Sequence, residues 1–487
     1  MSVPITIAKK RFSSEDQLEF ARLSGDRNPM HMDALAARRT QSGSTVVHGI
    51  HSLLWALENV IATVGPTVPP VNRISGQFQK LVNVGDTANL VLTRQNASQI
   101  RAQIQVDGLV VTAITLALGV RPWASESASV PTLKFEAAEP RMPLDQSLDQ
   151  IAGQSALIRF AAPAAEMQSA FPLAARQIGA SRIAALAAAS RLVGMICPGL
   201  HSILSAVALD LVDEDHAPSD SIQCAVLSTD NRFRLVTHFV QGGGLKGEVV
   251  SFVRTPPVEQ ASIAEIAKSV DPAEFKGSVA LVAGASRGLG QLTARILAAG
   301  GAHVIATYAA GRPEAEQLAT EIREWGGACD VVEYDVRKPS KDQLHALRTF
   351  PTHLYYFATA PIFRQKPPVF SPQLFHEFLA FYVTGFHDLC QTLRELCPAG
   401  ARVFYPSSIA LDDRPPGMTE YAMAKAAGEI LCADMSQLLP GIRVLSKRLP
   451  RMLTDQTATV IPARSTPALE VMLPIVREVQ VIGSPVS

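Results

Sequence analysis

"GIHSLLWALENVIATVG", residues 49–65, decides the fold of the first part of this chain. Its apolar residues follow the i, i+3, i+4, i+7 spacing of one helix face. They are Ile50, Leu53, Leu54, Leu57, Val60, Ile61 and Val64. Four strand-like runs follow within residues 72–121, and Gly-Asp or Asp-Gly turn signals separate them. We therefore predict an antiparallel sheet wrapped around one long helix.

A short, stiff turn lies ahead of this helix. "SSEDQLEFARLSG", residues 13–25, indicates a helix with a serine start, an acidic first turn and a glycine stop. The loop that leaves it, "SGDRNPMH" at residues 24–31, places Asp26 and His31 on one Asn-Pro turn. A carboxylate and an imidazole held together suit acid–base chemistry, because one can take a proton while the other donates or orients.

A second copy of this pattern follows a Ser-, Pro- and Glu-rich stretch near residues 124–145. "PGLHSIL" at 198–204 echoes "HGIHSLL" at 48–54, and strand-like runs again come after it. The second copy has no counterpart of residues 24–31, so we expect it to shape a pocket. His51 and His201 occur in both copies, and we assign neither a role because such helix histidines are more often structural.

Strands and helices alternate from about residue 276, which predicts a parallel, doubly wound sheet. "VAGASRGLG", residues 282–290, follows a strand and opens a helix. That is the context in which a glycine-rich loop binds a pyrophosphate through backbone amides. Gly284, Gly288 and Gly290 are the positions of close approach.

Length and charge limit the classes of function. A chain of 487 residues predicts about three domains of ~150 residues each. Acidic and basic residues balance at 44 each, so we expect neither nucleic acid nor membrane as a partner. There is no signal peptide or bilayer-spanning run, which predicts a cytoplasmic protein. The six cysteines form no C-x-x-C pair, and we expect no metal and no disulfide framework.

The stretch "FARLSGDRNPMHMDALAA" from Phe20, with its P-x-H step, resembles the MaoC-like, (R)-specific enoyl-thioester hydratases of the hotdog fold. The resemblance covers roughly residues 10–122. It implies that Asp26 and His31 hold and activate the water that adds across an enoyl thioester, or that leaves in the reverse reaction. The enolate charge that develops on the thioester carbonyl would be met by backbone N–H groups at the start of the Gly49 helix.

The glycine-rich loop, "YAMAK" at residues 421–425 and a serine thirteen residues before the tyrosine together resemble a short-chain dehydrogenase/reductase. The resemblance covers about residues 276–450. It implies that Tyr421 donates a proton to the substrate carbonyl and that Ser408 hydrogen-bonds this carbonyl. Tyr421 and Lys425 share one helix face, so the ammonium can favour the phenolate and hold the cofactor ribose.

The same resemblance gives the cofactor. "HVIATY" ends without the acidic residue that binds a free ribose 2′-hydroxyl, while Arg287 and Arg312 are available for a 2′-phosphate, which favours NADPH over NADH. Asp335 matches the position that contacts adenine. The predicted cofactor-binding residues are Gly284, Ser286, Arg287, Gly288, Leu289, Gly290, Arg312, Asp335, Val336, Tyr421 and Lys425.

Four departures from the reductase pattern stand out. "ATA" at residues 358–360 replaces the usual N-A-G, and Tyr382 occupies the place of an asparagine that anchors a relay water. Pro450-Arg451 replaces a Pro-Gly step, and the tail is short.

The predicted fold class is a multidomain α/β chain: an N-terminal double hotdog, of the α+β type, followed by a Rossmann-type doubly wound parallel sheet. The predicted domains are residues 1–125, the degenerate hotdog 126–260, and the reductase 275–487. The leading hypothesis is a two-step enzyme that reduces a 3-oxoacyl thioester and dehydrates the (R)-3-hydroxyacyl product in fatty-acid or polyketide-like assembly. Its acyl group would be carried by acyl carrier protein or coenzyme A, and we expect a homo-oligomer.

Two alternatives stay open. One is a monofunctional hydratase with an inactive reductase-like scaffold, which Tyr382 and the short tail favour. The other is a docking platform in which both sites are vestigial.

Overall fold

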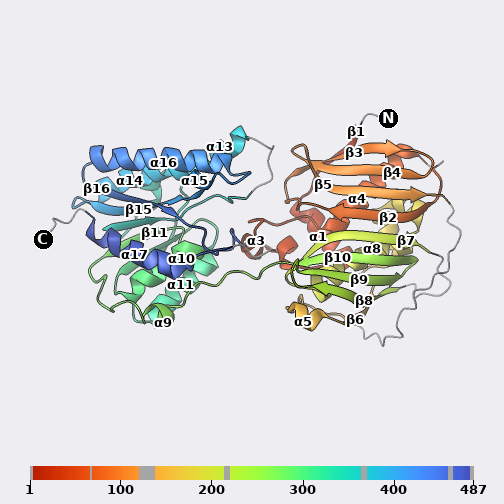
Figure 1. Cartoon of the computed structure of the whole chain (residues 1–487), viewed down its shortest axis with the longest axis horizontal. Coiled ribbons are helices and arrows are strands. Elements are labelled where there is room, and N and C mark those ends of the chain that lie inside the picture. Colours follow the sequence, from red (N-terminus) through yellow and green to blue (C-terminus); the bar gives the residue numbers. More distant parts are fainter. Residues whose placement is uncertain are drawn as a thin grey trace. The chain divides into compact units, whose positions relative to one another are not determined.

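The computed structural model describes residues 4–65, 68–119, 138–212, 220–363, 370–458 and 464–482. The chain forms two compact units. The N-terminal unit is Met1–Pro256, and the C-terminal unit comprises Pro257–Ala458 and Ala463–Ser487 (Figure 1). The domain boundary that we predicted at residues 125 and 126 lies outside the described residues.

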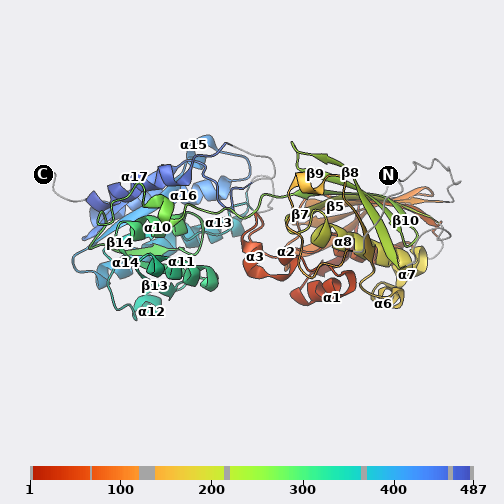
Figure 2. The ribbon, with the colours of Figure 1, turned by 90° about the horizontal axis from the view of Figure 1, so that it is seen from below.

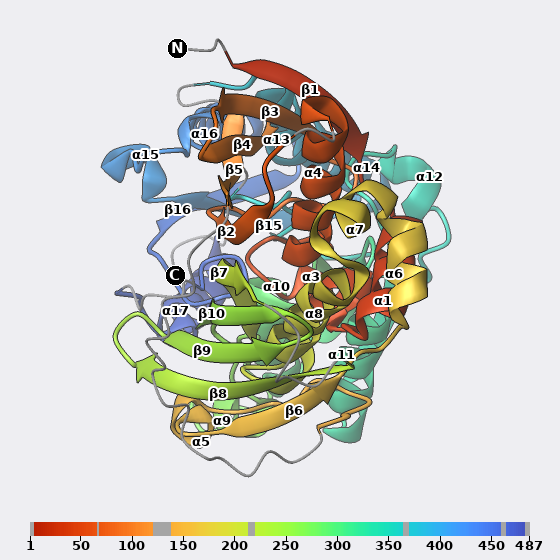
Figure 3. The same ribbon diagram turned by 90° about the vertical axis from the view of Figure 1, so that its right-hand side faces the viewer.

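The N-terminal unit is built on a ten-stranded antiparallel sheet in the order β1-β3-β4-β5-β2-β7-β10-β9-β8-β6. The strands are β1 (Ile5–Arg11), β2 (Val71–Phe78), β3 (Thr87–Gln95), β4 (Gln99–Val106), β5 (Leu109–Leu118), β6 (Ser155–Arg159), β7 (Ser202–Leu211), β8 (Ser221–Asp230), β9 (Leu235–Gly242) and β10 (Leu245–Val253). The sheet curves around two helices, α4 (Gly49–Val64) and α8 (Ala180–Arg191) (Figure 3). The predicted antiparallel sheet around a long helix is confirmed.

The two halves of this sheet arrange their corresponding strands in the same order, counted inward from each edge. Counted inward, β1, β3, β4, β5 and β2 match β6, β8, β9, β10 and β7, and α4 and α8 hold the same place in the two halves. The two halves join where β2 pairs with β7, and Arg73 Nη1 lies 2.7 Å from Asp210 Oδ2 at this seam. The unit is therefore a repeated fold, the double hotdog expected from the sequence.

The short sequence similarity between residues 48–54 and 198–204, which suggested the repeat, nevertheless does not align equivalent parts of the two halves. Residues 198–204 do not open a helix, because α8 continues as a π-helix, η1 (Leu192–Ile196), and ends before Pro198, and Ser202 begins β7. His51 lies in the first turn of α4, whereas His201 lies ahead of a strand, so the two histidines are not equivalent. The true second helix is rich in alanine and buried on nearly every side, so its sequence shows little amphipathic spacing.

The core of the first half rests on α4. Leu53 and Leu54 are fully buried against the sheet, as the helical spacing predicts. Leu54→Ala should lower the free energy of unfolding of the N-terminal unit by about 2–5 kcal/mol, because it removes buried apolar surface and leaves a cavity. Urea unfolding followed by tryptophan fluorescence measures this loss. Leu18→Ala on α1 (Ser14–Ser24), where the side chain is 60% exposed, is the matched control and should change little.

The C-terminal unit has a parallel sheet whose described strands follow the order β13-β12-β11-β14-β15-β16. These are β11 (Val279–Ala283), β12 (His303–Tyr308), β13 (Ala328–Glu333), β14 (His353–Tyr356), β15 (Ala401–Ser408) and β16 (Ile442–Leu449). The order reverses between β11 and β14, and in such sheets ligands bind at the carboxyl ends of the strands beside this point. The predicted doubly wound parallel sheet is confirmed.

Helices cover both faces of this sheet (Figure 1). One face packs against α9 (Ile263–Ile266), α10 (Gly288–Ala299), α11 (Arg312–Glu324) and α17 (Ala468–Val481). The other packs against α12 (Ser340–Leu344), α13 (Pro372–Leu379), η2 (Ala380–Thr384), α14 (Gly385–Leu396) and α16 (Thr419–Leu438). A short helix, α15 (Ala410–Asp413), follows β15.

The remaining short helices belong to the N-terminal unit, where α6 and α7 lie on the same side of the sheet as α1 and α8 (Figure 2). They are α2 (Pro29–Met32), α3 (Ala34–Arg38), α5 (Leu148–Ile151), α6 (Ala164–Ala170) and α7 (Pro172–Ile178).

Among the described residues, no single helix is long and apolar enough to cross a membrane. Pro172–Ile178 and Ala180–Ile196 satisfy that test only as a pair bent by 109°.

Candidate functional site

Asp26 is placed by the end of α1 and by the second half of the fold. Gly25 caps α1 in the left-handed conformation, with φ of 76°, and turns the chain inward. Asp26 and Asn28 are then buried. The Asn28 side chain accepts from Met30 N and donates to the carbonyl of Gly194, at 2.8 Å. The turn is therefore fastened to η1 as well as to its own chain.

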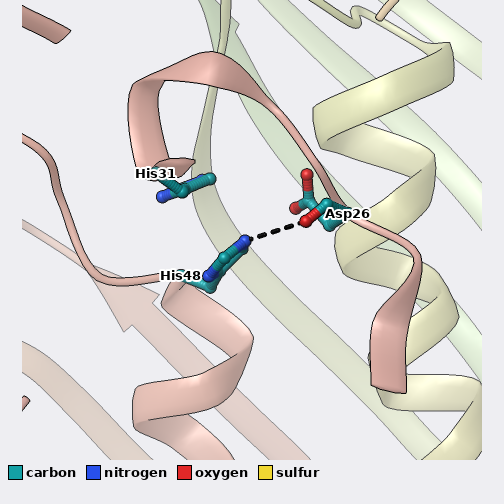
Figure 4. A group of neighbouring side chains, drawn as sticks. All are labelled: Asp26, His31 and His48. Carbon is teal, nitrogen blue, oxygen red and sulfur yellow. Dashed lines mark hydrogen bonds between the residues drawn. The ribbon is translucent and has the colours of Figure 1, made fainter. Parts of the chain in front are cut away.

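His31 and Asp26 meet as the sequence predicts. Their ligand-type atoms, together with those of His48, all lie within 4.8 Å of one another (Figure 4). His31 Nδ1 lies 2.8 Å from the carbonyl oxygen of Val46, which can only accept, so Nδ1 carries the proton. His31 Nε2 is then the nitrogen that is able to accept a proton.

His48 is a member of this cluster that sequence reasoning missed. Its ring stacks on that of His31, with centroids 3.9 Å apart. Nδ1 lies 2.9 Å from Gln17 Oε1, and Nε2 lies 3.1 Å from the backbone oxygen of Asp26. The only signal was its position directly before the helix that starts at Gly49. Both ring nitrogens contact protein oxygens, so His48 ties the Asp26 main chain to the start of α4.

Burial controls the ionisation of this cluster. It raises the pKa of Asp26, while the charge of His31 and hydrogen bonds from Ser190 and Asn28 act to lower it. Burial lowers the pKa of His31, and the Asp26 charge opposes that shift. It also lowers the pKa of His48 well below the usual histidine value. At neutral pH His31 is therefore uncharged, the state in which its Nε2 can take a proton.

A pocket opens onto Asp26, His31 and Gly49. Gly49 begins α4 and lines the pocket, and within the described part of the chain His48 makes no side-chain capping bond to the amides of the first turn. A Cβ on Gly49 would lie 3.0 Å from Leu204 Cδ2 and 3.2 Å from Phe78 Cε1. A residue with a Cβ at position 49 would therefore have to displace these two pocket-lining side chains slightly. The second half lines the same pocket with Ser190, Val193, Gly194, Ser202, Ile203 and Leu204, as expected of a pocket-shaping copy.

The glycine-rich loop of the C-terminal unit has the conformation that close approach of a ligand needs. Gly284 and Gly288 have φ of 84° and 59°, and a Cβ on Gly290 would lie 2.1 Å from the oxygen of Gly284. Arg287 is the N-cap of α10, and it offers no side-chain capping bond within the described residues. Ser286 is buried and Leu289 packs against the core. The loop therefore presents helix N-terminal amides to a phosphate, and its residues fit a dinucleotide.

The other predicted cofactor residues lie around the ends of β11 to β13. Arg312 begins α11 and is exposed, with Nε 3.8 Å from Glu316 Oε1. Arg287 Nη1 lies 3.6 Å from Asp455 Oδ2. The Asp335 carboxylate accepts hydrogen bonds from the Arg337 guanidinium at 2.9 and 2.7 Å. Both predicted 2′-phosphate ligands are thus near a carboxylate, which a bound phosphate would have to compete with. Val336 is buried beside this strand end.

Tyr421 and Lys425 lie on one face of α16, as predicted, and burial rather than the Lys425 charge dominates the pKa of the phenol. Burial raises the pKa of Tyr421 to about 12, and only a hydrogen bond with Ser408 acts to lower it. Burial lowers the pKa of Lys425 to about 7. Its Nζ donates to the carbonyl of Pro406 at 2.6 Å and is 6.0 Å from the Tyr421 ring centroid. The ammonium is directed at a backbone carbonyl rather than at the phenol.

Two of the departures from the reductase pattern contact each other. Tyr382 lies on η2, is buried, and its hydroxyl hydrogen-bonds that of Thr359, the central residue of "ATA". The ring of Tyr382 lies edge-on to that of Tyr421, with centroids 5.6 Å apart, and Lys425 Nζ lies 4.0 Å from its centroid. Tyr382 thus fills the space beside both predicted catalytic residues.

Comparison with known proteins agrees with this division of the chain. A family model described as a MaoC like domain matches residues 2–115, and one for short chain dehydrogenase matches residues 278–464. Over 84 residues the chain is 33% identical to 3-hydroxybutyryl-CoA dehydratase of Methylorubrum extorquens. That match covers 16% of this chain and 51% of the dehydratase, so the chain spans about half the length of this relative.

The chain also has relatives among reductases and dehydrogenases. The chain is 26% identical over 192 residues to an NADPH-dependent aldehyde reductase-like protein of Arabidopsis thaliana, a match that covers 36% of this chain and 71% of that protein. A solved short chain dehydrogenase from Burkholderia cenocepacia, in complex with NADP, is 22% identical. The match covers 42% of this chain and 91% of that one, with a TM-score of 0.38. The chain thus carries a MaoC-like dehydratase domain at residues 2–115 and a short-chain dehydrogenase domain at residues 278–464.

Proposed function

We propose that this protein is a two-step enzyme acting on acyl thioesters. The C-terminal unit reduces a 3-oxoacyl thioester with NADPH, and the N-terminal unit dehydrates the (R)-3-hydroxyacyl product reversibly to the enoyl thioester. The observation that carries the proposal is the pair of buried Asp26 and half-buried His31, which lines a pocket together with Gly49 at the start of α4. An acyl carrier protein or coenzyme A would carry the acyl group, and the working form would be a homo-oligomer.

In the N-terminal site the chemistry is addition or removal of water. Asp26 and His31 hold the water, and one of them takes its proton as the oxygen bonds to C3 of the enoyl group. A proton is delivered to C2, which completes the hydroxyacyl thioester. Negative charge develops on the thioester oxygen during this step, and the amides at Gly49 are donors suited to stabilise it. The uncharged Nε2 of His31 is a competent base because Val46 fixes the proton on Nδ1.

In the C-terminal site, NADPH would be held by the loop of Gly284, Gly288 and Gly290, with Arg312 at its 2′-phosphate. When bound, it supplies the hydride that reduces the 3-oxo carbon. Tyr421 would give its phenolic proton to the carbonyl oxygen, and Ser408 would hold that oxygen by a hydrogen bond. A phenol with its pKa raised to about 12 retains its proton at neutral pH and can therefore donate it.

A specific observation favours one alternative, a monofunctional hydratase with an inactive reductase-like unit. Tyr382 fills the space beside Tyr421, and Lys425 donates to Pro406 instead of facing the phenol. The residue types at Ser408, Tyr421 and Lys425 and the fit of the glycine-rich loop weigh toward an active reductase.

The two half-reactions can be tested separately. The purified full chain is mixed with a short enoyl-coenzyme A, and hydration is followed as the loss of absorbance of the conjugated thioester. A parallel assay mixes it with a 3-oxoacyl-coenzyme A and follows NADPH oxidation. Activity in both assays supports the two-step enzyme, and hydration alone supports the alternative. The absence of hydration would overturn both.

The pH dependence of hydration follows from the surroundings of Asp26 and His31. The reaction needs Asp26 ionised, and burial raises the pKa of this carboxyl above its ordinary value. Activity should therefore be lost on the acid side at a higher pH than an exposed aspartate would give. Burial lowers the pKa of His31, so its neutral form persists to lower pH than that of an exposed histidine. A profile of kcat/KM against pH measures the limb, and a midpoint at the ordinary aspartate value would contradict this assignment.

A further inference from the structure

A serine from the second half of the fold contacts the carboxylate of the first half. Ser190 lies near the end of α8 and is buried. Its hydroxyl donates a hydrogen bond to Asp26 Oδ2 at 2.7 Å. A longer bond to the same carboxylate comes from Asn28 N, which reaches Oδ1 at 3.2 Å within the turn itself. Ser190 therefore supplies the shorter of these bonds, and it does so from a segment 164 residues away.

The next turn of the same helical segment leaves room for the carboxylate. Gly194 lies on η1, and a Cβ on it would be 2.2 Å from Asp26 Oδ1 and 2.6 Å from Oδ2. No side chain fits there while Asp26 keeps its position. The carbonyl of Gly194 also accepts from Asn28 Nδ2, so the turn that carries Asp26 is fixed to η1. One segment, Ser190 to Gly194, therefore forms a seat for the Asp26 carboxylate. Ser190 donates a hydrogen bond to the carboxylate, Gly194 leaves space for it, and the Gly194 carbonyl holds the turn that carries it.

We propose that Ser190 is a positioning residue for Asp26, and that the half lacking the Asp26–His31 turn is retained because it supplies this seat, with Gly194 giving the carboxylate its space. The proposal rests on the proposed hydration at Asp26 and His31. It assigns the second half a specific chemical task in addition to lining the pocket.

The consequence of the Ser190 bond has a definite sign. A hydroxyl that donates to a carboxylate stabilises its ionised form, and a buried carboxylate without that bond holds its proton to higher pH. The titratable groups around Asp26 are His31 and His48, and Arg254 acts on His31. None of these changes when Ser190 is replaced. A shift of the Asp26 titration after removal of the hydroxyl therefore reports on this bond.

The test compares Ser190→Ala with Ser251→Ala in the full chain. Ser251 is buried in the same unit, and its hydroxyl has no hydrogen-bond partner within the described residues, so its loss controls for removal of a buried hydroxyl. Ser190→Ala should lower kcat/KM for hydration roughly 10–100-fold, the effect of losing a hydrogen bond to a charged group. Its acid limb should move to higher pH, while Ser251→Ala should keep the wild-type profile. Ser190→Thr, which keeps a hydroxyl, should restore the profile.

A second measurement does not depend on activity. The carboxyl ¹³C signal of Asp26, identified by its loss in Asp26→Asn, is titrated in wild type and Ser190→Ala. A rise in the Asp26 pKa in Ser190→Ala supports the proposal. An unchanged titration, or an unchanged pH profile in a folded Ser190→Ala protein, overturns it. If wild type hydrates no enoyl thioester, the proposed function fails, and the carboxyl titration still decides the role of Ser190.

Discussion

Asp26→Asn and His31→Ala should each slow enoyl-thioester hydration by about 10²–10⁴-fold, the usual contribution of a general acid or base. The amide introduced by Asp26→Asn would keep the shape of the carboxylate and lose its charge and basicity. His31→Ala would remove the ring nitrogen that His31 presents to the pocket. The decrease should appear in kcat more than in KM, because the pair acts on the reacting water. Initial rates with a short enoyl-coenzyme A measure it.

One control variant and one double variant complete this experiment. Glu15→Gln removes an exposed carboxylate from α1 and should leave the rate unchanged. The double variant Asp26→Asn, His31→Ala should be little slower than the slower single variant, because groups that act as a unit are not additive. Wild-type rates in both single variants would mean that the site is vestigial, and the docking-platform hypothesis would then explain the fold better.

Tyr421→Phe should reduce NADPH oxidation with a 3-oxoacyl thioester by a similar factor of about 10²–10⁴ and leave hydration intact. The variant removes one oxygen, the proton donor to the carbonyl, and the phenyl ring keeps its edge-on contacts with Tyr382 and Phe378. Separate loss of one activity is expected because the two predicted sites lie in different compact units.

Tyr355→Phe is the matched control for this experiment. Its hydroxyl is buried in the same unit and accepts from Gln480 Nε2 at 3.3 Å, away from α16. It should oxidise NADPH at the wild-type rate. If Tyr421→Phe does so as well, the phenol is not the proton donor. If wild type itself oxidises no NADPH, the contacts of Tyr382 with Tyr421 and Lys425 explain an inactive unit.

Features encoded locally could be predicted from the sequence. The α4 face, the four strands after it and the alternation from residue 276 follow from side-chain spacing and turn residues, and the structure has them all. The Asp26–His31 turn and the glycine-rich loop are also local, because a few consecutive residues fix their shape. For these elements, neighbours in sequence are neighbours in space.

The remaining features depend on contacts between distant segments. Ser190 has no special sequence context, and its bond to Asp26 arises only when α8 packs beside the turn. The same holds for His48 with Gln17 and for Tyr382 with Thr359. The echo at 198–204 misled because a short apolar run suits a strand as well as a helix, and α8 itself has no polar face to mark it.

The repeated fold explains why a half without catalytic residues is retained. One half carries the turn with Asp26 and His31, and the other provides the helix that holds Asp26 and part of the pocket wall. Because the halves share one continuous sheet through β2 and β7, this contact is built into a single unit.

The most direct test of the two-step activity is mass spectrometry of the products formed from a 3-oxoacyl thioester and NADPH by the full chain. Wild type should yield the hydroxyacyl thioester together with the enoyl thioester. His31→Ala should stop at the hydroxyacyl thioester, and Tyr421→Phe should leave the 3-oxo substrate. Unchanged 3-oxo substrate with wild-type protein that still hydrates an enoyl thioester would contradict the two-step enzyme.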